Sequence, residues 1–421
     1  MIFPHSRPRR FRGEALEYAG TEPGWEPPGR KAPALIKFDG VTKRFPGGTV
    51  AVDNLTLEVP AGQIMVLVGP SGCGKTTTLR MINGLVEPTE GTILLDGQDI
   101  RQANPARLRQ GIGYVIQQAG LFPHRTVEDN IATVPLLTGW GRAKARARAR
   151  ELMELVGLDA VMARRYPHQL SGGQQQRVGV ARALAADPPV LLMDEPFSAV
   201  DPIVRAGLQA ELLRLQAELR KTVVFVTHDV EEAIKLGDLV TVMRPGGLVA
   251  QSDPPERLLT APVDQYVEDF VGFDRGIRRL SFFPASGLDL DTDAVVTEQM
   301  TVADALRRAK DSGQPWLLVT DAERLPRGWA ATSALEDLPA GRPLGEIMLE
   351  DYGHAFSVAS DSLRAALDAT VLSPTGRAAG VDTAGRVLGV TSYERLRIAI
   401  QSAEASSAMS SAAGGESGSA P

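Results

Sequence analysis

Residues 64–82 read IMVLVGPSGCGKTTTLRMI. The stretch begins with five apolar residues, which is typical of a strand buried on both faces of a parallel sheet. A glycine-rich loop follows, and its Gly69, Gly74, Lys75 and Thr76 satisfy the pattern G-x-x-x-x-G-K-[ST]. Together these features predict a strand, a phosphate-binding loop and a helix within an α/β domain.

The composition of this loop suits the phosphates of a nucleotide. Glycines let the backbone wrap closely, so that several N–H groups point inward, and the following helix contributes its positive N-terminal end. We expect Lys75 to reach the β- and γ-phosphates and the Thr76 hydroxyl to bind Mg²⁺. The residues expected to surround the nucleotide here are Gly69, Pro70, Ser71, Gly72, Cys73, Gly74, Lys75, Thr76 and Thr77.

Three further apolar strands lead into polar residues. These residues are Gln117 after YVI, Asp194 and Glu195 after VLLM, and His228 after VVFVT. Asp194 is the natural acidic partner of Mg²⁺, and Glu195 is placed to polarise an attacking water, a role worth about 10²–10⁴-fold in rate. Gln117 could bind Mg²⁺ or water, and His228 could contact the γ-phosphate. The predicted metal ligands are therefore Thr76, Gln117 and Asp194.

Between the loop and the acidic strand lies LSGGQQQRV, residues 170–178. Its Ser-Gly-Gly opens an expected helix, and a serine hydroxyl at a helix N-terminus suits an anion. Few nucleotide-binding proteins carry this element between the other two, so the combination favours ATP hydrolysis by a two-subunit motor.

This set of motifs, in this order, resembles the ATP-binding cassette (ABC) ATPase family over about residues 35–272. GPSGCGKT resembles its Walker A motif, Gln117 its Q-loop, LSGGQQQRV its signature, VLLMDEP its Walker B motif and His228 its switch histidine. Ser198 to Asp201 resemble the D-loop, and Phe45 stands where an aromatic ring stacks on adenine. The resemblance implies the cofactors ATP and Mg²⁺. The resemblance also adds further residues to the predicted nucleotide site, namely Phe45, Ser171, Gly172, Gly173 and Asp201.

The same resemblance implies partners. Two cassettes would pack head to tail, so that Ser171–Gly173 of one subunit close on the γ-phosphate held by the other. Residues 113–140, 201–205, 231–238 and 267–276 also resemble the ATPases of importers for glycine betaine, choline, carnitine or proline betaine. We therefore expect a homodimer bound to transmembrane permease subunits, with an extracytoplasmic substrate-binding protein in the complex. Such a subunit would lie peripherally on the cytoplasmic face of the membrane.

After about residue 273 an internal repeat begins. Residues 301–338 and 358–396 each read as helix, strand, turn, strand and helix, offset by about 60 residues. The pair resembles tandem CBS domains, which would bind a nucleotide, sense ionic strength or only dimerise. Leu335 and Arg395 stand where adenosine-binding repeats have an aspartate, so Arg395 would meet a phosphate or a lipid headgroup, unless the pair holds no ligand.

The predicted organisation is an α/β cassette with a mostly parallel sheet, antiparallel strands and a helical subdomain, followed by an α+β pair. The chain is expected to consist of a flexible tail at 1–34, the ABC domain at 35–272, the two repeats at 273–343 and 344–401, and a disordered tail at 402–421.

Composition narrows the function classes. The net charge of −6 gives no support to a nucleic-acid substrate, and the single cysteine excludes an internal disulfide. No apolar run approaches the length needed to cross a bilayer. The basic run at 142–150 is interpreted as a solvated helix face. Two alternatives stay open at this point: an import ATPase for another small solute, and a soluble ABC ATPase outside transport.

Overall fold

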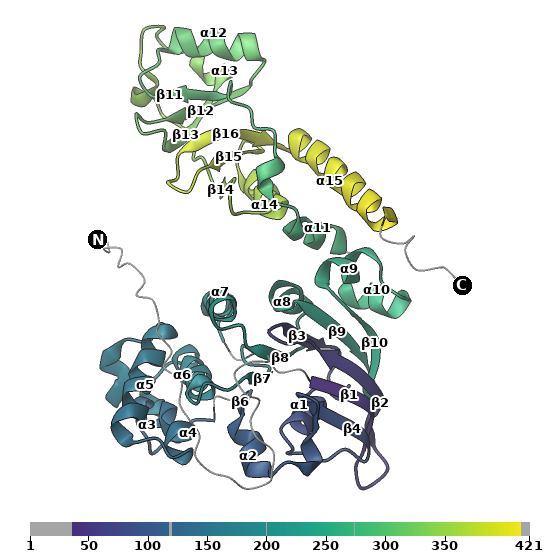
Figure 1. The fold of residues 1–421 in the computed structure, drawn as a ribbon. Coiled ribbons are helices and arrows are strands. Elements are labelled where there is room, and N and C mark those ends of the chain that lie inside the picture. Colours follow the sequence, from purple (N-terminus) through teal and green to yellow (C-terminus); the bar gives the residue numbers. More distant parts are fainter. Residues whose placement is uncertain (1–35, 118–119, 199, 273, 414–421) are drawn as a thin grey trace. The chain divides into compact units, whose positions relative to one another are not determined.

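The computed structural model describes residues 36–117, 120–198, 200–272 and 274–413 (Figure 1). It divides into two compact units. Unit 1 holds the residues up to His228 together with Met243–Val249, and unit 2 holds Asp229–Val242 and the residues from Ala250 onward. The expected tail at 1–34 lies outside the described residues. None of the described helices combines the length and the hydrophobicity that a bilayer-spanning segment needs.

Four parallel strands form the centre of unit 1. Their order is β3 (Ile64–Val68), β8 (Thr222–Thr227), β7 (Val190–Asp194) and β6 (Ile112–Val115). Every residue of β3, β7 and β8 is buried, as expected of strands covered on both faces. This confirms the predicted parallel sheet. The carboxyl ends of these strands meet at one edge, where a ligand-binding crevice forms in such folds.

A second, antiparallel sheet completes the β-structure of unit 1. Its order is β2 (Val50–Val59), β1 (Ile36–Arg44), β4 (Glu90–Leu95) and β5 (Gln98–Asp99). Phe38 of β1 pairs with Leu57 of β2 and with Ile93 of β4, and all three side chains are buried. The sheet therefore has its own apolar face, which stabilises it by removing these side chains from water.

Helices cover the sheets of unit 1. They are α1 (Lys75–Ile82), α2 (Pro105–Gln110), α3 (Val127–Ile131), α4 (Thr133–Leu137), α5 (Arg142–Leu155), α6 (Gly172–Leu184) and α7 (Pro202–Leu219), with short 3₁₀ turns at Ile100–Gln102, Ala160–Arg164 and Pro167–Gln169. Helices α3, α5 and α6 pack on one another as a helical group. On α7 the side chains of Leu208, Leu212 and Leu215 are buried. The basic run at 142–150 begins α5, where Ala145 and Ala149 face the core.

Unit 2 starts with α8 (Val230–Leu236), and β9 (Leu239–Arg244) and β10 (Leu248–Asp253) are hydrogen-bonded neighbours. Three short helices follow: α9 (Pro255–Thr260), α10 (Gln265–Val271) and α11 (Arg275–Arg279), with 3₁₀ turns at Leu280–Phe282 and Ala285–Gly287. The two compact units divide at His228, whereas the sequence predicts a domain boundary near residue 272. The predicted domain bounds stay a prediction.

The rest of unit 2 contains two three-stranded sheets of the same topology. In the first, β11 (Val295–Thr297) runs parallel to β12 (Trp316–Thr320), and β12 pairs antiparallel with β13 (Pro326–Ala331). In the second, β14 (Ala355–Ser357) runs parallel to β15 (Arg377–Val381), which pairs antiparallel with β16 (Val387–Ser392). Helices α12 (Val302–Ser312) and α14 (Leu363–Leu372) join the parallel strands, α13 (Thr332–Leu335) and α15 (Tyr393–Ala413) follow the last strands, and a 3₁₀ turn spans Leu344–Glu346.

Each of the two repeats therefore contains one more strand than the sequence predicts. Strands β11 and β14 have only three residues each, which is too short to show a hydrophobic period. The two sheets share one core cluster, which includes Leu318 and Trp329 from the first and Val390 from the second. Trp329 is fully buried, and its indole N–H donates to the Tyr352 carbonyl at 3.3 Å. The helices of each repeat cover one face of its sheet, and this shared cluster covers the other face of both sheets.

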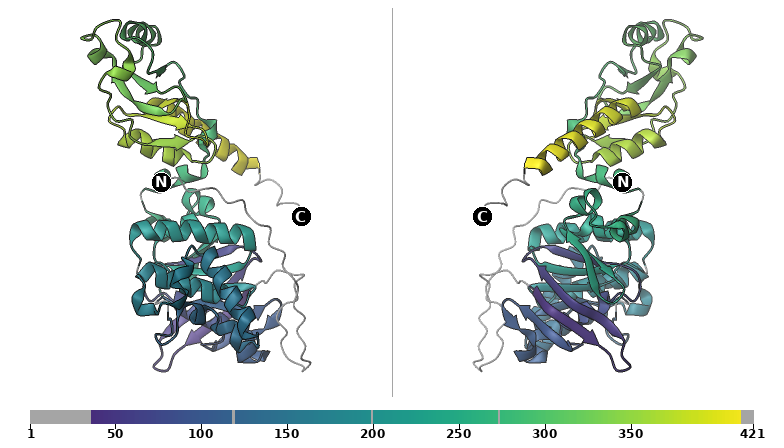
Figure 2. Two further views of the ribbon diagram at one scale, coloured as in Figure 1. Left: turned by 90° about the vertical axis from the view of Figure 1, so that its left-hand side faces the viewer. Right: turned by 90° about the vertical axis from the view of Figure 1, so that its right-hand side faces the viewer.

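The C-terminal prediction differs from the structure. The tail at 402–421 is expected to be disordered, yet α15 continues to Ala413, and residues 414–421 lie outside the described part. Figure 2 shows α15, in yellow, extending beyond the sheet that it follows. The segment is low in complexity but rich in alanine, which has the highest helix propensity of the amino acids.

Candidate functional site

The glycines of the phosphate-binding loop are required by its backbone. Gly74 immediately precedes α1 and has φ +99°, in the left-handed region. A Cβ on this residue would lie 2.3 Å from the Ala51 carbonyl oxygen of β2. Only glycine satisfies both the dihedral angle and this close approach. The loop between β3 and α1 is thus held against β2 by close backbone packing.

Lys75, the first residue of α1, is buried with its ammonium group turned into the loop. Its Nζ donates to the carbonyl oxygens of Gly69 at 2.7 Å and Pro70 at 2.9 Å, and lies 3.7 Å from Cys73 Sγ. The ammonium forms no ion pair with any described residue. Its positive charge is therefore held by carbonyl dipoles at the place where phosphate oxygens are expected.

The predicted metal ligands Thr76 and Asp194 come together at the end of β7. The Thr76 hydroxyl donates to Asp194 Oδ1 at 2.9 Å. Burial raises the pKa of the Asp194 carboxyl, while the Thr76 hydrogen bond and the charge of Arg80 act in the opposite direction. Burial, followed by the negative charge of Asp194, also raises the pKa of the Tyr114 hydroxyl. Arg80 and Tyr114 are site residues that the sequence analysis missed, because neither lies in a recognisable motif.

Glu195, Gln117 and His228 converge although they follow three different strands. Gln117 Nε2 donates to Glu195 Oε2 at 3.0 Å, and His228 Nδ1 lies 3.3 Å from the same oxygen. The Glu195 backbone has φ 45°, which is unusual for a residue with a side chain, and its N–H donates to the Val226 carbonyl of β8 at 3.0 Å. The carboxylate is thus held between an amide and an imidazole, a suitable arrangement for orienting and deprotonating a water.

The signature residues begin α6. Ser171 caps this helix in a reciprocal arrangement with Gln174: its Oγ accepts from the Gln174 N–H at 3.3 Å, and the Gln174 side chain accepts from the Ser171 N–H at 3.0 Å. A Cβ on Gly173 would lie 2.7 Å from Val204 Cγ1, so α7 packs closely here. Among the described residues, no hydrogen bond or ion pair joins Ser171–Gly173 to the phosphate-binding loop of the same chain.

Most of the remaining predicted nucleotide contacts are exposed. Phe45 directly follows β1, is 38% exposed, and has Lys43 Nζ at 5.2 Å from its ring centroid. Asp201 caps α7 by accepting from the Ile203 N–H at 3.0 Å. Ser71 and Gly72 are exposed at the tip of the loop, whereas Cys73 is buried. No described contact brings Phe45 or Asp201 to the phosphate-binding loop, so their assignment to the nucleotide site remains a prediction.

One buried side chain that the sequence analysis missed organises the segment after Gln117. Asn130 of α3 is fully buried. Its Oδ1 accepts from the Phe122 N–H at 2.7 Å, and its Nδ2 donates to the carbonyls of Phe122, Arg125 and Thr126 at 3.0 to 3.1 Å. Arg182 of α6 donates to the Gly120 carbonyl at 2.7 Å. These contacts hold the segment against the helical group.

We expect Asn130→Ala to loosen this segment. The substitution leaves several backbone groups of residues 122–126 without a partner, which costs about 1–3 kcal/mol. Hydrogen–deuterium exchange should therefore accelerate at residues 120–126. Asn104→Ala, which removes the cap of α2 instead, is the control and should leave exchange in this segment unchanged. Unchanged protection in Asn130→Ala would show that other contacts, such as that of Arg182, suffice.

Comparisons with known proteins agree with this geometry. The family described as ABC transporter matches residues 52–198. The osmoprotectant import ATP-binding protein OsmV of Salmonella typhimurium is 43% identical over 369 residues, which cover 86% of this chain and 94% of that protein. The glycine betaine/carnitine/choline transport ATP-binding protein OpuCA of Bacillus subtilis is 44% identical over 303 residues, which cover 72% of this chain and 80% of that protein.

A solved structure shares the fold of the cassette. Clostridium perfringens cbiO1, which is part of the ABC transporter complex cbiONQ, matches with a TM-score of 0.51 and 26% identity, over 55% of this chain and 92% of that one. The phosphate-binding loop, the acidic strand end and the signature all lie within residues 52–198, which the family model matches. The chain therefore belongs to the ABC transporter family, as an ATP-binding subunit with ATPase activity.

Proposed function

We propose that this chain is the ATPase subunit of an importer for quaternary-amine osmoprotectants such as glycine betaine, choline or carnitine. The supporting observation is how far the similarity extends. An Fe(3+) import ATP-binding protein of Brucella abortus is 46% identical, but over 240 residues and 57% of this chain. The osmoprotectant relative matches at 43% over 86% of the chain. The percentage identity is similar for the two relatives, so it does not distinguish Fe³⁺ from an osmoprotectant as the transported solute. The greater length of chain that matches the osmoprotectant relative favours an osmoprotectant.

In this proposal the phosphate-binding loop holds the nucleotide. Lys75 exchanges the Gly69 and Pro70 carbonyls for phosphate oxygens, and the loop N–H groups bind the same phosphates. Phe45 stacks on the adenine ring through its exposed face. The remaining loop residues, Pro70–Cys73 and Thr77, surround the phosphates. Because Lys75 already lies inside the loop, little side-chain rearrangement is required when ATP binds.

Thr76 of α1 and Asp194 of β7, which are joined by a hydrogen bond, fit a magnesium ion together with Gln117, which follows β6. Thr76, Asp194 and Gln117 offer a hydroxyl, a carboxylate and an amide oxygen, which are the hard ligands that Mg²⁺ prefers. Within the described ranges, no group of three or more His, Cys, Asp or Glu side chains could hold a metal by itself. This sparse donor set is appropriate for an ion that shares its coordination with phosphate and water. When bound, Mg²⁺ would offset the negative charge of the β- and γ-phosphates.

Glu195 would act on the attacking water. Its carboxylate is held by Gln117 and lies beside His228, so it can accept a proton from a water placed against the γ-phosphate. His228, which directly follows β8, would contact the γ-phosphate and couple the presence of this phosphate to the position of β8. The three side chains thus form the catalytic group of the proposal.

The proposal includes a second copy of the chain. Ser171, Gly172 and Gly173 offer a hydroxyl and helix N-terminal N–H groups, and within one chain they have no described contact with the phosphate-binding loop. They would close on the γ-phosphate held by the partner copy, with Asp201 at the same junction. Such a dimer would open and close with each hydrolysis. It would drive permease subunits, to which an extracytoplasmic binding protein delivers the solute, from the cytoplasmic face of the membrane.

Reconstitution tests this function. The chain is incorporated into liposomes with the permease subunits and binding protein that co-purify with it. ATP-dependent uptake of labelled glycine betaine, choline, carnitine and Fe³⁺ is then measured, with Lys75→Ala as the inactive control. We expect uptake of at least one quaternary amine and none of Fe³⁺. Uptake of Fe³⁺ without any of the amines would contradict the solute assignment and leave the ATPase assignment intact.

A further inference from the structure

The aromatic residue proposed to stack on adenine is covered on one side by a lysine of the preceding strand. Lys43 lies in β1, and Phe45 directly follows the last residue of this strand. Residues two apart in an extended chain project from the same side, so the Lys43 side chain can lie over the Phe45 ring. Its Nζ is 5.2 Å from the ring centroid, a distance at which an ammonium is attracted to the face of an aromatic ring. One face of the ring is therefore occupied by a cation.

The Lys43 ammonium is also anchored to the backbone of a neighbouring segment. It donates a hydrogen bond to the Glu87 carbonyl oxygen at 2.7 Å, between α1 and β4. This segment is itself fixed along β1. The Thr89 N–H donates to the Thr42 carbonyl at 2.7 Å, and the Arg44 N–H donates to Thr89 Oγ1 at 3.0 Å. The ammonium thus joins the Phe45 ring to a carbonyl group whose position is set by backbone hydrogen bonds.

No acidic side chain competes with the ring for this ammonium. Lys43 forms no ion pair with any residue that the structure describes. The adjacent Arg44 pairs instead with two carboxylates, that of Asp53 at 3.8 Å and that of Glu90 at 3.9 Å. The charge of Lys43 is therefore left to the Phe45 ring and to the carbonyl that anchors it.

The backbone of Phe45 is fixed by a tight turn. Its N–H donates to the Thr49 carbonyl at 2.9 Å, and its carbonyl accepts from the Gly48 N–H at 3.1 Å. Gly47 and Gly48 have φ +99° and +85°, which favour glycine at both positions. The Phe45 side chain is 38% exposed, so the turn alone leaves its ring free to change rotamer. The ammonium restrains this ring and leaves only its other face available to a base.

We propose that Lys43 is a positioning residue for nucleotide binding: its ammonium holds the Phe45 ring so that the opposite face is presented to adenine. This role rests on the stacking on adenine proposed for Phe45. A ring that is already oriented loses less conformational entropy when the base binds. The faces of an aromatic ring also carry negative charge, which opposes face-to-face stacking, and an ammonium on one face offsets part of this charge. Both effects favour binding of the base.

Steady-state ATP hydrolysis by the full chain tests this role. Lys43→Ala removes the cation and should raise the KM for ATP by about two- to fivefold, the range for an exposed cation–π contact. The kcat should not change, because the contact is the same in the ground state and in the transition state. Lys43→Arg should restore the normal KM, since a guanidinium also stacks on an aromatic face.

A double-mutant cycle determines whether Lys43 acts through the ring. Phe45→Ala alone should raise the KM for ATP by about tenfold or more, because stacking of the base on an aromatic side chain is lost. Adding Lys43→Ala to Phe45→Ala should raise the KM no further, since the ring that Lys43 positions is absent. An equal rise in both backgrounds would mean that Lys43 contacts the nucleotide directly, and it would overturn the positioning role.

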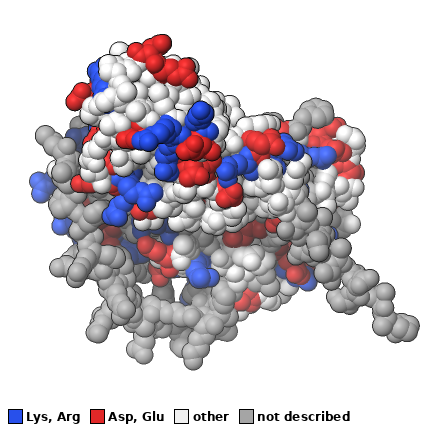
Figure 3. Space-filling model, turned by 90° about the horizontal axis from the view of Figure 1, so that it is seen from above, with Lys and Arg blue, Asp and Glu red and all other residues white. Residues whose placement is uncertain are grey.

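Lys43 acts by local contact and not through a general positive field. The net charge of the chain is −6, and acidic and basic residues are intermixed on the face drawn in Figure 3. Lys37→Ala, which removes another lysine of β1, is therefore the matched control and should leave the KM unchanged. Thermal unfolding without nucleotide is measured for every variant, so that a folding defect is not mistaken for lost stacking.

Two further results separate the role of Lys43 from the function on which it rests. A raised KM in Phe45→Ala together with a normal KM in Lys43→Ala would overturn the role of Lys43 and leave the stacking role of Phe45 intact. A normal KM in Phe45→Ala would contradict the stacking role and would remove the role of Lys43 with it. In that case continued ATP hydrolysis would still support the ATPase assignment.

Discussion

Glu195→Gln should lower the ATPase rate by about 10²–10⁴-fold, the range for loss of a general base. The glutamine side chain keeps the size of glutamate and can still accept a hydrogen bond from Gln117, so the packing at the end of β7 is preserved. It cannot accept a proton from water. ATP binding depends on the loop between β3 and α1 and should change only slightly. Phosphate release measures the rate, and equilibrium binding of a fluorescent ATP analogue measures affinity.

The matched control is Glu154→Gln, at an exposed glutamate of α5 that lies outside every motif. This variant should hydrolyse ATP at the normal rate. Because Glu195→Gln binds ATP without hydrolysing it, the variant should also accumulate as a dimer in ATP and return to monomer when ATP is removed. Size-exclusion chromatography measures this. Normal turnover in Glu195→Gln would remove the assigned role, whereas slow turnover without any dimer would contradict the shared-site proposal alone.

Lys75→Ala should weaken ATP binding by about 10- to 100-fold, since it removes charge-assisted hydrogen bonds to phosphate. The effect on folding should be small. The ammonium contacts only the loop itself, at two carbonyl oxygens 2.7 and 2.9 Å away and at Cys73 Sγ 3.7 Å away, and the carbonyl oxygens can turn to water when the side chain is shortened. Thermal unfolding without nucleotide should therefore change little, and the stabilisation that ATP adds to the normal chain should be lost.

Lys37→Ala is the control for charge. It removes an exposed lysine that pairs with Glu58 on the antiparallel sheet, at 2.7 Å. Its ATP affinity should equal that of the unmodified chain. If Lys75→Ala retained full affinity, the phosphates would have to be held by backbone N–H groups alone, and the role assigned to Lys75 would be wrong.

Much of the site was predictable because its chemistry follows from short sequence patterns. The spacing of Gly69, Gly74 and Lys75 specifies a local backbone path, so the loop could be recognised without any tertiary contact. Gln117, Glu195 and His228 lie far apart in sequence. Their convergence still followed from one rule: parallel strands end at the same edge of a sheet. Each of these predictions used either a local dihedral requirement or a regular property of strands.

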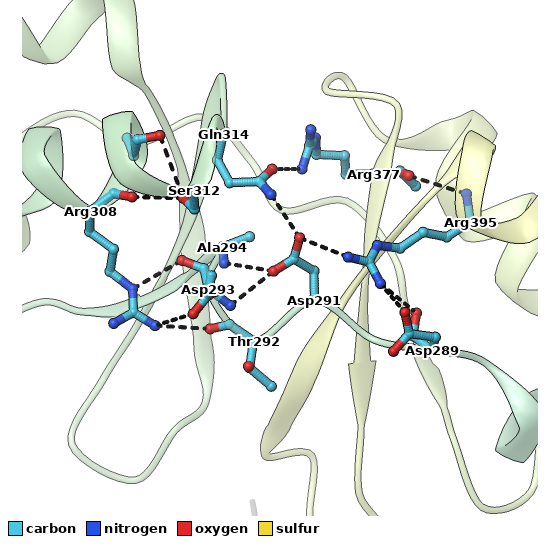
Figure 4. A network of polar contacts seen from close by, with 12 residues as sticks. Asp289, Asp291, Thr292, Asp293, Ala294, Arg308, Ser312, Gln314, Arg377 and Arg395 are labelled. Atoms are coloured by element: carbon cyan, nitrogen blue, oxygen red, sulfur yellow. Dashed lines mark hydrogen bonds and ion pairs between the residues drawn. The ribbon is translucent and has the colours of Figure 1, made fainter.

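Other features depend on contacts between residues far apart in the sequence, and no short sequence pattern predicts these contacts. Asn130 is one polar residue among many until the fold buries it against the segment at 120–126. Arg395 pairs within the chain with Asp289 and Asp291, more than a hundred residues earlier (Figure 4), and no short sequence pattern predicts these ion pairs. Strands β11 and β14 were missed because a three-residue strand is stabilised by its neighbours and not by its own propensity.

The sequence by itself therefore determined the family, the α/β architecture of the cassette and the identity of the residues proposed to bind and hydrolyse ATP. Only the tertiary structure decided which side chains hold those residues in place, and that the Glu87 carbonyl anchors the Lys43 ammonium beside the Phe45 ring. The reason is physical. Glycine spacing and apolar periodicity act over a few residues of chain, whereas a hydrogen bond or ion pair depends on which distant groups the packing of the core brings within about 3 Å.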